Sequence, residues 1–277
     1  MATEGRGPDF VEALARGLDV LRSFGVSGTT MSLTQVADAT ALARPTARRL
    51  LLTLAELGYV RTCDGRFALT PRVLELGMAY IGSLGLWDIA RPHLENLVRH
   101  TGESSSMSQL DGSDIVYIAR VAVPKLIALR VDIGTRFPAA RCSQGKVLLA
   151  ALDPTHVDHV LAQPSRSGLP PRPHEHTTIH PILDEVRARG WALADEELAP
   201  GVRSVAVPVR DGRGHVLAAM NVTVHAAETT LDTLLDQHLP KLLRAAADIS
   251  ADWTRWQARP EVRLERPSPT AVHDAAS

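Results

Sequence analysis

The chain is poor in cysteine and in aromatic residues, and it has no long apolar run. Only two of its 277 residues are cysteines, Cys63 and Cys142, and only 4% are aromatic. Two distant cysteines exclude a disulfide scaffold and a Cys-x-x-Cys zinc site, and they are typical of a reducing compartment. No apolar stretch reaches the roughly 20 residues that cross a bilayer. Met1–Pro8 is polar and glycine-rich, without the apolar core of a signal peptide. We therefore expect a cytoplasmic protein with a flexible N-terminus over residues 1–8.

The composition is that of a globular protein with two domains. Apolar residues make up 45% of the chain and charged residues 22%, as in ordinary soluble domains. The length exceeds the roughly 100–200 residues of one core. The net charge is only −1, but the stretch from Ala39 to Arg72 carries six arginines (Arg44, Arg48, Arg49, Arg61, Arg66 and Arg72) against Glu56 and Asp64. A local excess of positive charge is the electrostatic footprint of a nucleic-acid-binding module.

Three helices are predicted before residue 58. Asp9 with Glu12, and then Ser32 with Gln35, have the spacing of capping boxes that open the first and second helices. The third helix is expected to start near Arg44, with a proline in its first turn, where the missing N–H costs nothing. The apolar positions recur at helical spacing. In the first helix they are Val11, Leu14, Leu18 and Leu21, and in the third they are Ala47, Leu50, Leu51, Leu54 and Leu57, before Gly58.

A β-hairpin is predicted directly after the third helix. Two short β-like runs, Tyr59–Thr62 and Arg66–Leu69, flank the Asp64-Gly65 pair. Asp-Gly between two strands is a strong hairpin signal. A helix, a helix-turn-helix (about residues 33–52) and a hairpin together describe a winged helix-turn-helix domain, which we place at residues 9–70.

In a helix-turn-helix, the N-terminal part of the second helix meets base edges in the major groove. The residues predicted there are Arg44, Pro45, Thr46, Arg48 and Arg49. Arginine can contact guanine with two hydrogen bonds. Ser32 and Thr34 are expected near the phosphates, and Arg61 and Arg66 on the wing at the flanking backbone or minor groove. The alternative is that these arginines form an ordinary solvated surface.

The remainder of the chain predicts an α+β domain. A linker helix is expected at residues 71–86, with Leu74, Met78 and Ile81 on one face, followed by a helix at 87–100. Strands are predicted at 105–110, 115–120, 126–133, 191–194, 202–209 and 216–225. Helices are predicted at 143–152, 155–162, 179–189 and 230–256, the last with Leu235, Leu239, Leu242, Ala246, Ile249 and Trp253 facing inward. We place this domain at residues 87–256 and a disordered tail at 257–277.

Polar side chains alternate with apolar ones on two of these strands. Asn221 and Thr223 share one strand face, and Ser204 lies on the strand before it. They are candidates to line a polar cavity, although a solvent-facing sheet alternates in the same way. Ser143 and Gln144 open a helix whose free N–H groups can hold a carboxylate.

Three separated motifs resemble the IclR family of bacterial transcriptional regulators. They are Ser32–Ala37 with Arg44–Leu51 and Leu57–Val60, then Gly134–Ala150, and then Glu196–Pro208. Phe10–Gly17, Leu69–Gly77, Asp114–Arg120 and Asn221–Ala226 resemble the branch that controls protocatechuate, 4-hydroxybenzoate and β-ketoadipate breakdown. The sequence departs from the family pattern at Ala43, where a capping Ser or Thr is common, and at Ala41, where the turn often has Gly.

The resemblance implies a GAF-like effector-binding domain with a curved antiparallel sheet, and a homodimer or homotetramer that binds a palindromic operator in double-stranded DNA. The linker helix and the C-terminal domain are both candidate dimer surfaces. The effector implied is a small carboxylate. Ligand contacts implied by the resemblance are Leu126, Ser143, Gln144, Ser204, Asn221 and Thr223. Arg130 and Arg141 are candidates to pair with the carboxylate, unless they are plain surface residues.

Two other classes of protein are alternatives. An enzyme would need a nucleophile such as Cys142 with a histidine base, but the chain has no nucleophile elbow, dinucleotide fingerprint or phosphate loop. His174, His176 and His180 have only a loose metal-like spacing. A scaffolding dimer without DNA function is the other alternative. We therefore predict no catalytic residue, metal or cofactor.

Overall fold

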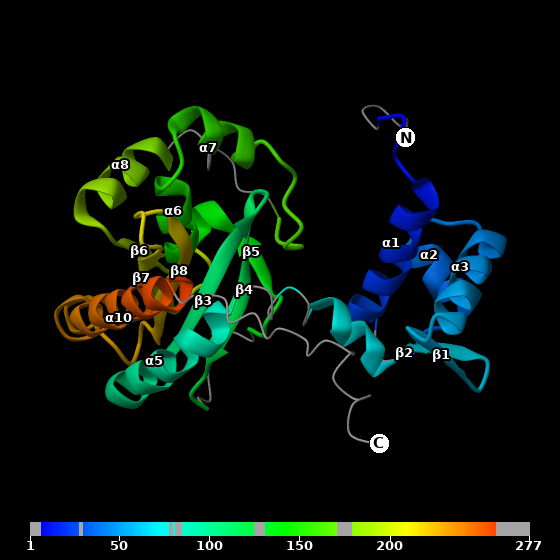
Figure 1. Cartoon of the computed structure of the whole chain (residues 1–277), viewed down its shortest axis with the longest axis horizontal. Helices are drawn as coiled ribbons and strands as arrows, with labels where there is room; N and C mark the ends of the chain where they lie inside the picture. Colours follow the sequence, from blue (N-terminus) through cyan, green and yellow to red (C-terminus); the bar gives the residue numbers. More distant parts are fainter. Residues whose placement is uncertain are drawn as a thin grey trace, which may run out of the picture. The chain divides into compact units, whose positions relative to one another are not determined.

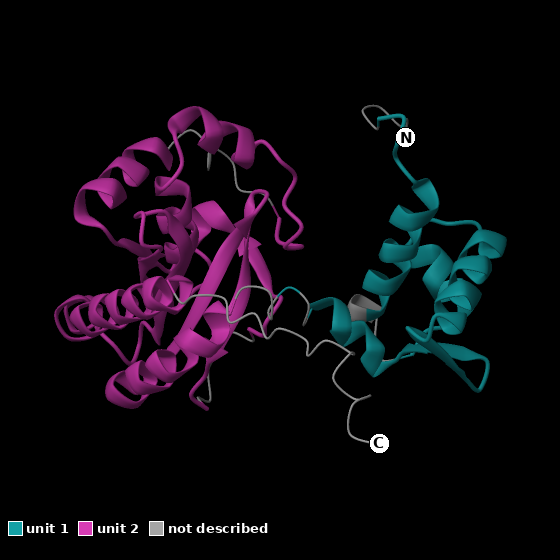
Figure 2. Cartoon of the chain, viewed as in Figure 1, with its two compact units in different colours: residues 1–84 teal, residues 85–277 magenta. Residues whose placement is uncertain are grey.

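The computed structural model describes residues 7–27, 30–77, 80, 85–124, 131–170 and 179–258. The chain divides into two compact units, residues 1–84 and 85–277, which Figure 2 shows in two colours. Each unit has its own buried apolar core. The predicted α+β fold with two folded parts is confirmed. The finer boundaries at residues 9, 70, 86 and 256 stay predictions.

Unit 1 contains three helices and a hairpin in the predicted order. The helices are α1 (Glu12–Ser27), α2 (Leu33–Ala39) and α3 (Arg44–Glu56), and the antiparallel strands are β1 (Val60–Cys63) and β2 (Arg66–Leu69). Asp64 and Gly65 both have positive φ, 49° and 72°, as the type I′ turn of a two-residue hairpin requires. The unit is a winged helix-turn-helix.

Local interactions at the start of α2 and in the turn before α3 define the helix-turn-helix. The Ser32 side chain accepts from the Gln35 amide at 3.2 Å, and the Ser32 amide donates to Gln35 Oε1 at 2.9 Å, so the capping box is present. Ala43 has the extended backbone of an N-cap but provides no side-chain cap. Ala41 adopts φ 53°, a left-handed conformation that costs a residue with a Cβ about 1–2 kcal/mol. The two departures from the family pattern therefore weaken the turn, which still joins α2 to α3.

Two predicted features of α1 are wrong. The helix begins at Glu12, so Asp9 is not its N-cap. Of the four apolar positions expected to form one face, Leu21 packs against the core, but Val11 is 62% exposed and Leu14 64%. Val20 and Phe24 fill the core instead. Periodicity alone chose the wrong face because α1 has two apolar stripes.

The inward face of α3 is confirmed for Ala47, Leu51 and Leu54, which are buried, and Leu50 packs against the same core. Leu57 is 52% exposed, because α3 ends at Glu56 and Leu57 is already its C-cap. A short 3-10 helix, η1 (Pro71–Val73), and helical residues 74–77 and 80 begin the predicted linker. Met78 and Ile81 lie outside the described residues.

Unit 2 is built on a six-stranded antiparallel sheet of order β5-β4-β3-β8-β7-β6. Its strands are β3 (Ser104–Asp111), β4 (Asp114–Val121), β5 (Arg136–Pro138), β6 (Ala192–Asp195), β7 (Val202–Arg210) and β8 (Val216–His225). Turns that contain Asp111-Gly112 and Asp211-Gly212 join β3 to β4 and β7 to β8.

Helices cover both faces of this sheet (Figure 1). α5 (Leu86–Thr101) lies beside the C-terminal helix, α10 (Leu239–Gln257), on one face. On the other face α6 (Ser143–Ala150) packs against β3, β7 and β8, with α8 (Ile179–Arg189) against it and α7 (Pro154–Leu161) nearby. The shorter elements are η2 (Ala139–Arg141), α9 (Leu231–Thr233) and η3 (Leu234–His238). The face covered by α6 carries the site described below.

Two elements differ from the prediction. The strand expected at 126–133 falls partly outside the described residues. Its last three residues, 131–133, belong instead to a turn closed by a Thr135 N to Asp132 O bond of 3.0 Å. The strand next to β4 is β5, which was not predicted. In the last helix, the five residues of η3 form a π-helical segment. That segment changes the helical phase, so Leu234 is fully buried in place of the predicted Leu235.

Candidate functional site

The first half of α3 presents an exposed basic surface. Arg44, Pro45, Arg48 and Arg49 are all exposed, and Thr46 is half-buried. Ala47, Leu51 and Leu54 hold the opposite side of the helix in the core. The predicted division between inward leucines and outward arginines is thus present on α3.

The wing and the start of α2 lie next to each other. Arg66 on β2 donates from Nε to Thr30 Oγ1 at 3.1 Å and from Nη2 to Gln35 Oε1 at 3.1 Å. Its guanidinium therefore holds the wing against the Ser32–Gln35 capping box. Thr34 is exposed on α2, and Arg61 is exposed on β1. Arg66 is exposed on the wing, as expected, and it also holds the wing against α2.

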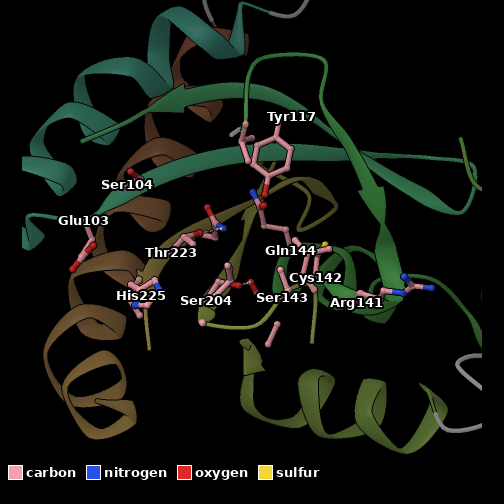
Figure 3. Close-up of a pocket in the computed structure, with 18 of the residues that line it drawn as sticks. Glu103, Ser104, Tyr117, Arg141, Cys142, Ser143, Gln144, Ser204, Thr223 and His225 are labelled. Atoms are coloured by element: carbon pink, nitrogen blue, oxygen red, sulfur yellow. Dashed lines mark hydrogen bonds between the residues drawn. The ribbon is translucent and has the colours of Figure 1, made fainter. Parts of the chain in front are cut away.

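Unit 2 contains a cavity of about 240 Å³ on the face of the sheet that α6 covers. Its walls come from β3, β4, β7, β8, the start of α6 and the loop 196–201 (Figure 3). Its volume is below the roughly 300–1,000 Å³ of pockets for drug-sized ligands. The cavity therefore has room for a small metabolite.

Hydrogen-bonding side chains from two adjacent strands meet in this cavity. Asn221 donates from Nδ2 to Thr223 Oγ1 at 2.9 Å, and Ser204 pairs with Thr223 across the β7–β8 ladder. The hydroxyls of Ser143 and Ser204 are 2.7 Å apart. Asn221 is 3% exposed and Ser204 8%, so this face of the sheet is not a solvent surface. The predicted polar side chains are brought together.

Gln144 places a fixed acceptor in the cavity wall. The side chain is 1% exposed, and Nε2 donates to Ser106 O and Ala219 O, both at 3.1 Å. These two carbonyls fix the orientation of the amide, because only the NH₂ end can donate to both. Oε1 has no hydrogen-bond partner in the described part of the chain. A ligand or water with a donor group can satisfy it.

The start of α6 adds backbone donors to this wall. Cys142 is the N-cap and provides no side-chain cap. The first amide that bonds within the helix is that of Lys146, to Cys142 O at 3.0 Å. The amides before it belong to the unsatisfied first turn of the helix, where the positive end of the helix dipole favours an anion.

An ion pair between a buried lysine and a partly exposed glutamate ties the loop 196–201 to α6. Lys146 is 3% exposed at its side chain, and its Nζ donates to both carboxylate oxygens of Glu197, at 2.6 and 2.7 Å, and to Leu193 O at 3.0 Å. Leu198, Pro200 and Gly201 of that loop line the cavity. One wall of the cavity is therefore anchored to the helix that forms another wall.

Of the two arginines that the sequence analysis named as carboxylate partners, Arg141 and Arg130, only Arg141 lies in the described residues. Arg141 is 5% exposed, and its Nη2 donates to Pro170 O at 2.8 Å. In Figure 3 its guanidinium points away from the side chains gathered around Ser143 and Gln144. Leu126 and Arg130 lie outside the described residues.

Sequence reasoning missed two cavity residues on β4, Tyr117 and Arg120. They are three positions apart, so strict alternation would place them on opposite faces. The register shifts between Met107 and Ser108, which leaves Ile118 as an extra residue in β4. This β-bulge returns both side chains to one face. A bulge has no reliable sequence signal of its own, which explains the omission.

Tyr117 and Arg120 also have perturbed pKa values. Burial raises the pKa of the Tyr117 phenol, and the nearby Cys142 raises it further, so the hydroxyl stays protonated and able to donate. Burial lowers the pKa of Arg120, whereas Tyr117 and Asp132 raise it. The guanidinium is thus a cation in a partly desolvated position.

The described residues do not form the groups of side chains that a metal site or an enzyme using Cys142 would need. Among the described residues, no group of three His, Cys, Asp or Glu side chains could hold a metal ion. His180 instead contacts Asp158 Oδ1 at 2.7 Å, and His174 and His176 lie outside the described residues. Cys142 lines the cavity but belongs to the apolar core cluster. No helix in the described ranges is both long and apolar enough to cross a membrane.

Comparison with known families and sequences gives concordant matches. Residues 13–63 match the IclR helix-turn-helix domain, and residues 78–251 match the bacterial transcriptional regulator IclR C-terminal domain. The chain is 40% identical over 245 residues to the Pca regulon regulatory protein of Pseudomonas putida, covering 87% of this chain and 84% of that one. It is 35% identical over 253 residues to the p-hydroxybenzoate hydroxylase transcriptional activator of Acinetobacter baylyi, covering 89% and 93%.

Solved structures agree with these matches. A transcriptional regulator from Rhodococcus sp. RHA1 has a TM-score of 0.76 and 43% identity, covering 89% of this chain and all of that one. An IclR homologue from Microbacterium hydrocarbonoxydans, solved in complex with 4-hydroxybenzoate, has a TM-score of 0.75 at 24% identity, covering 88% and 99%. The second of these supports the fold alone.

Proposed function

Because the chain belongs to the IclR family of bacterial transcriptional regulators, we propose that it is a regulator whose operator binding is set by a small carboxylate effector. The resemblance to the protocatechuate branch that the sequence motifs indicated is confirmed by the relatives. The observation that carries the proposal is one chain with two sites: an arginine-covered α3 in unit 1 and, in unit 2, a cavity with hydrogen-bonding side chains in its wall.

We assign DNA binding to residues 9–70. Arg44, Arg48 and Arg49 on α3 are proposed to read base edges, with Pro45 and Thr46 beside them in the groove. Ser32, Thr34, Arg61 and Arg66 are proposed to contact the sugar-phosphate backbone or the minor groove. The exposure of these arginines on α3 supports this assignment. Since DNA is the partner, the proposed location is the cytoplasm.

We assign effector binding to residues 87–256, joined to the DNA-binding part by residues 71–86. The proposed effector is an aromatic acid or a β-ketoadipate-pathway metabolite, because relatives in this branch are named for the pca genes and for p-hydroxybenzoate hydroxylase. The residues proposed to contact the effector are Ser143, Gln144, Ser204, Asn221 and Thr223, with Arg141 at the edge and with Leu126 and Arg130 outside the described residues. An unrelated small metabolite is the alternative effector within the same family. We propose no catalytic role for Cys142.

An effector can shift DNA binding only if it binds one arrangement of the protein more tightly than another. A regulator of this kind needs two α3 helices at a fixed spacing, which a dimer on a palindromic site provides. We propose that the effector changes this spacing. The joining segment and unit 2 are candidate dimer surfaces, and α1 is a third.

The exposed stripe of α1 supports self-association. Leu14 and Leu18 are four residues apart on one helix face, and they are 64% and 41% exposed. Exposed apolar residues at helical spacing are typical of an interaction surface. We expect Leu14→Asp with Leu18→Asp to lower the oligomer mass measured by sedimentation of the full chain. Asp19→Ala, also exposed on α1 but about 100° around the helix from Leu18, is the matched control. An unchanged mass in the double variant would assign self-association to the other two surfaces.

A footprint on the DNA upstream of the protein's own gene tests the proposed function. We expect protection of a palindrome, with DNA affinity that falls as salt rises because phosphate contacts release counterions. Added 4-hydroxybenzoate, protocatechuate or β-ketoadipate is expected to change that affinity. Protection without a response to any of the three acids would contradict the effector class, and no protection at all would contradict the regulator itself.

A further inference from the structure

Arg120 lines the cavity, and among the described residues no ion pair neutralises its charge. Its Nη1 donates to Ser106 Oγ at 3.1 Å. Asp132 is near enough to favour the charged form, but among the described residues no carboxylate lies within ion-pair distance of this guanidinium. A guanidinium has five N–H donors in a planar fork. A partly buried cation with most of its donors uncommitted is costly unless an anion pairs with it.

The bulge at Ile118 directs this charge toward the cavity. Arg120 pairs with Ser106 across the β3–β4 ladder, and Ser106 pairs with Asn221 across the β3–β8 ladder. Residues paired in this way share one face of the sheet. Arg120 therefore lies in the row of side chains that includes Asn221, next to the protonated hydroxyl of Tyr117.

The other charged side chains that line the cavity do not face the middle of its polar wall. Arg141 directs its guanidinium to Pro170 O. Glu103 lies at the start of β3, where its Oε1 accepts from Thr229 Oγ1 at 3.4 Å. It is three strand positions from Ser106, roughly 10 Å along the strand. His225 is at the far end of β8, beside Gly201. Arg120 is thus the cation that faces the middle of the polar wall.

We propose that Arg120 pairs with the carboxylate of the effector and makes the cavity select acids over their neutral analogues. This inference rests on the proposed function, because it assigns a specificity-determining residue to the same site. A carboxylate accepts two parallel hydrogen bonds from a guanidinium, and Tyr117 can donate to the same group. The remaining polar wall, including the unpaired Gln144 Oε1, is then left to the rest of the effector.

Calorimetric titration of the full chain tests the proposal. The probes are 4-hydroxybenzoate, protocatechuate and β-ketoadipate, with 4-hydroxybenzamide as the neutral analogue of the first. Wild-type protein is expected to bind an acid and to bind the amide more weakly. Arg120→Gln is expected to weaken acid binding about tenfold or more and to remove the preference for the acid over the amide. Arg120→Lys, which keeps the charge but not the fork, is expected to fall between them.

Arg213→Gln, at an exposed arginine in the β7–β8 turn, is the matched control and should bind like wild type. The tryptophan fluorescence of Arg120→Gln shows whether unit 2 is folded, because all four tryptophans belong to that unit. If Arg120→Gln does not fold, the proposal is tested by the preference for the acid over the amide, measured in wild type and in Arg120→Lys. Equal binding of acid and amide by wild type, or undiminished acid binding by Arg120→Gln, would overturn the role of Arg120. Binding of none of the three acids would overturn the effector class of the proposed function instead.

Discussion

Gly145→Ala is expected to destabilise unit 2 by about 3 kcal/mol or more, at the upper end of the cost of overpacking. Gly145 is the third residue of α6, and a Cβ there would lie 2.0 Å from Ala139 O and 2.4 Å from Ala139 Cα. Both atoms belong to the backbone of η2, so no side chain can rotate to make room. Either η2 or α6 must move, and both line the cavity. We therefore expect a loss of effector binding together with the loss of stability.

Tryptophan fluorescence measures this effect selectively, because all four tryptophans (Trp87, Trp191, Trp253 and Trp256) belong to unit 2. Gly17→Ala in α1 is the control, since a Cβ at Gly17 would meet no neighbouring group within 4 Å. The control should leave the tryptophan transition in urea unchanged. Equal transition midpoints for Gly145→Ala and wild type would contradict the close approach of α6 to η2.

Alanine at Arg48 or at Arg49 is expected to lower affinity for the specific operator by about 1–3 kcal/mol, which is roughly 5- to 150-fold. Both side chains are exposed on α3, whereas Ala47, Leu51 and Leu54 are its buried residues. Their removal should leave the fold intact, because neither arginine packs into the core. The loss is expected to be larger for the operator than for unrelated DNA, since base contacts carry the discrimination.

Gel shifts at a fixed salt concentration measure this difference, with circular dichroism to establish that the variants are folded. Arg22→Ala provides a control that removes the same charge from α1. If Arg48→Ala and Arg49→Ala bound both DNAs like wild type, α3 would not be the reading helix. A uniform loss on both DNAs would assign these arginines to the phosphates.

The winged helix was largely predictable because local signals agree with one another. The Ser32–Gln35 capping box, Pro45 in the first turn of α3 and the Asp64-Gly65 turn each fix a boundary within a few residues. The burial of α1 was not predictable. Its two apolar stripes satisfy the same periodicity, and only packing against α3 selects Val20 and Phe24.

The cavity was predictable only where the strands alternate regularly. Asn221, Thr223 and Ser204 follow period-two alternation and were identified from it. Arg120 was not, because the bulge at Ile118 changes the phase of β4. The π-helical segment at Leu234–His238 shifts the phase of the last helix in the same way. Both errors come from one extra residue in an otherwise periodic element.

The contact between Lys146 and Glu197 has a kinetic consequence. To open the loop 196–201, the chain must separate a carboxylate from an ammonium group that solvent hardly reaches. The separated state is high in energy, since the ammonium would be left without its counter-ion. An effector that passes this loop is therefore expected both to enter and to leave slowly, because the same opening precedes both steps.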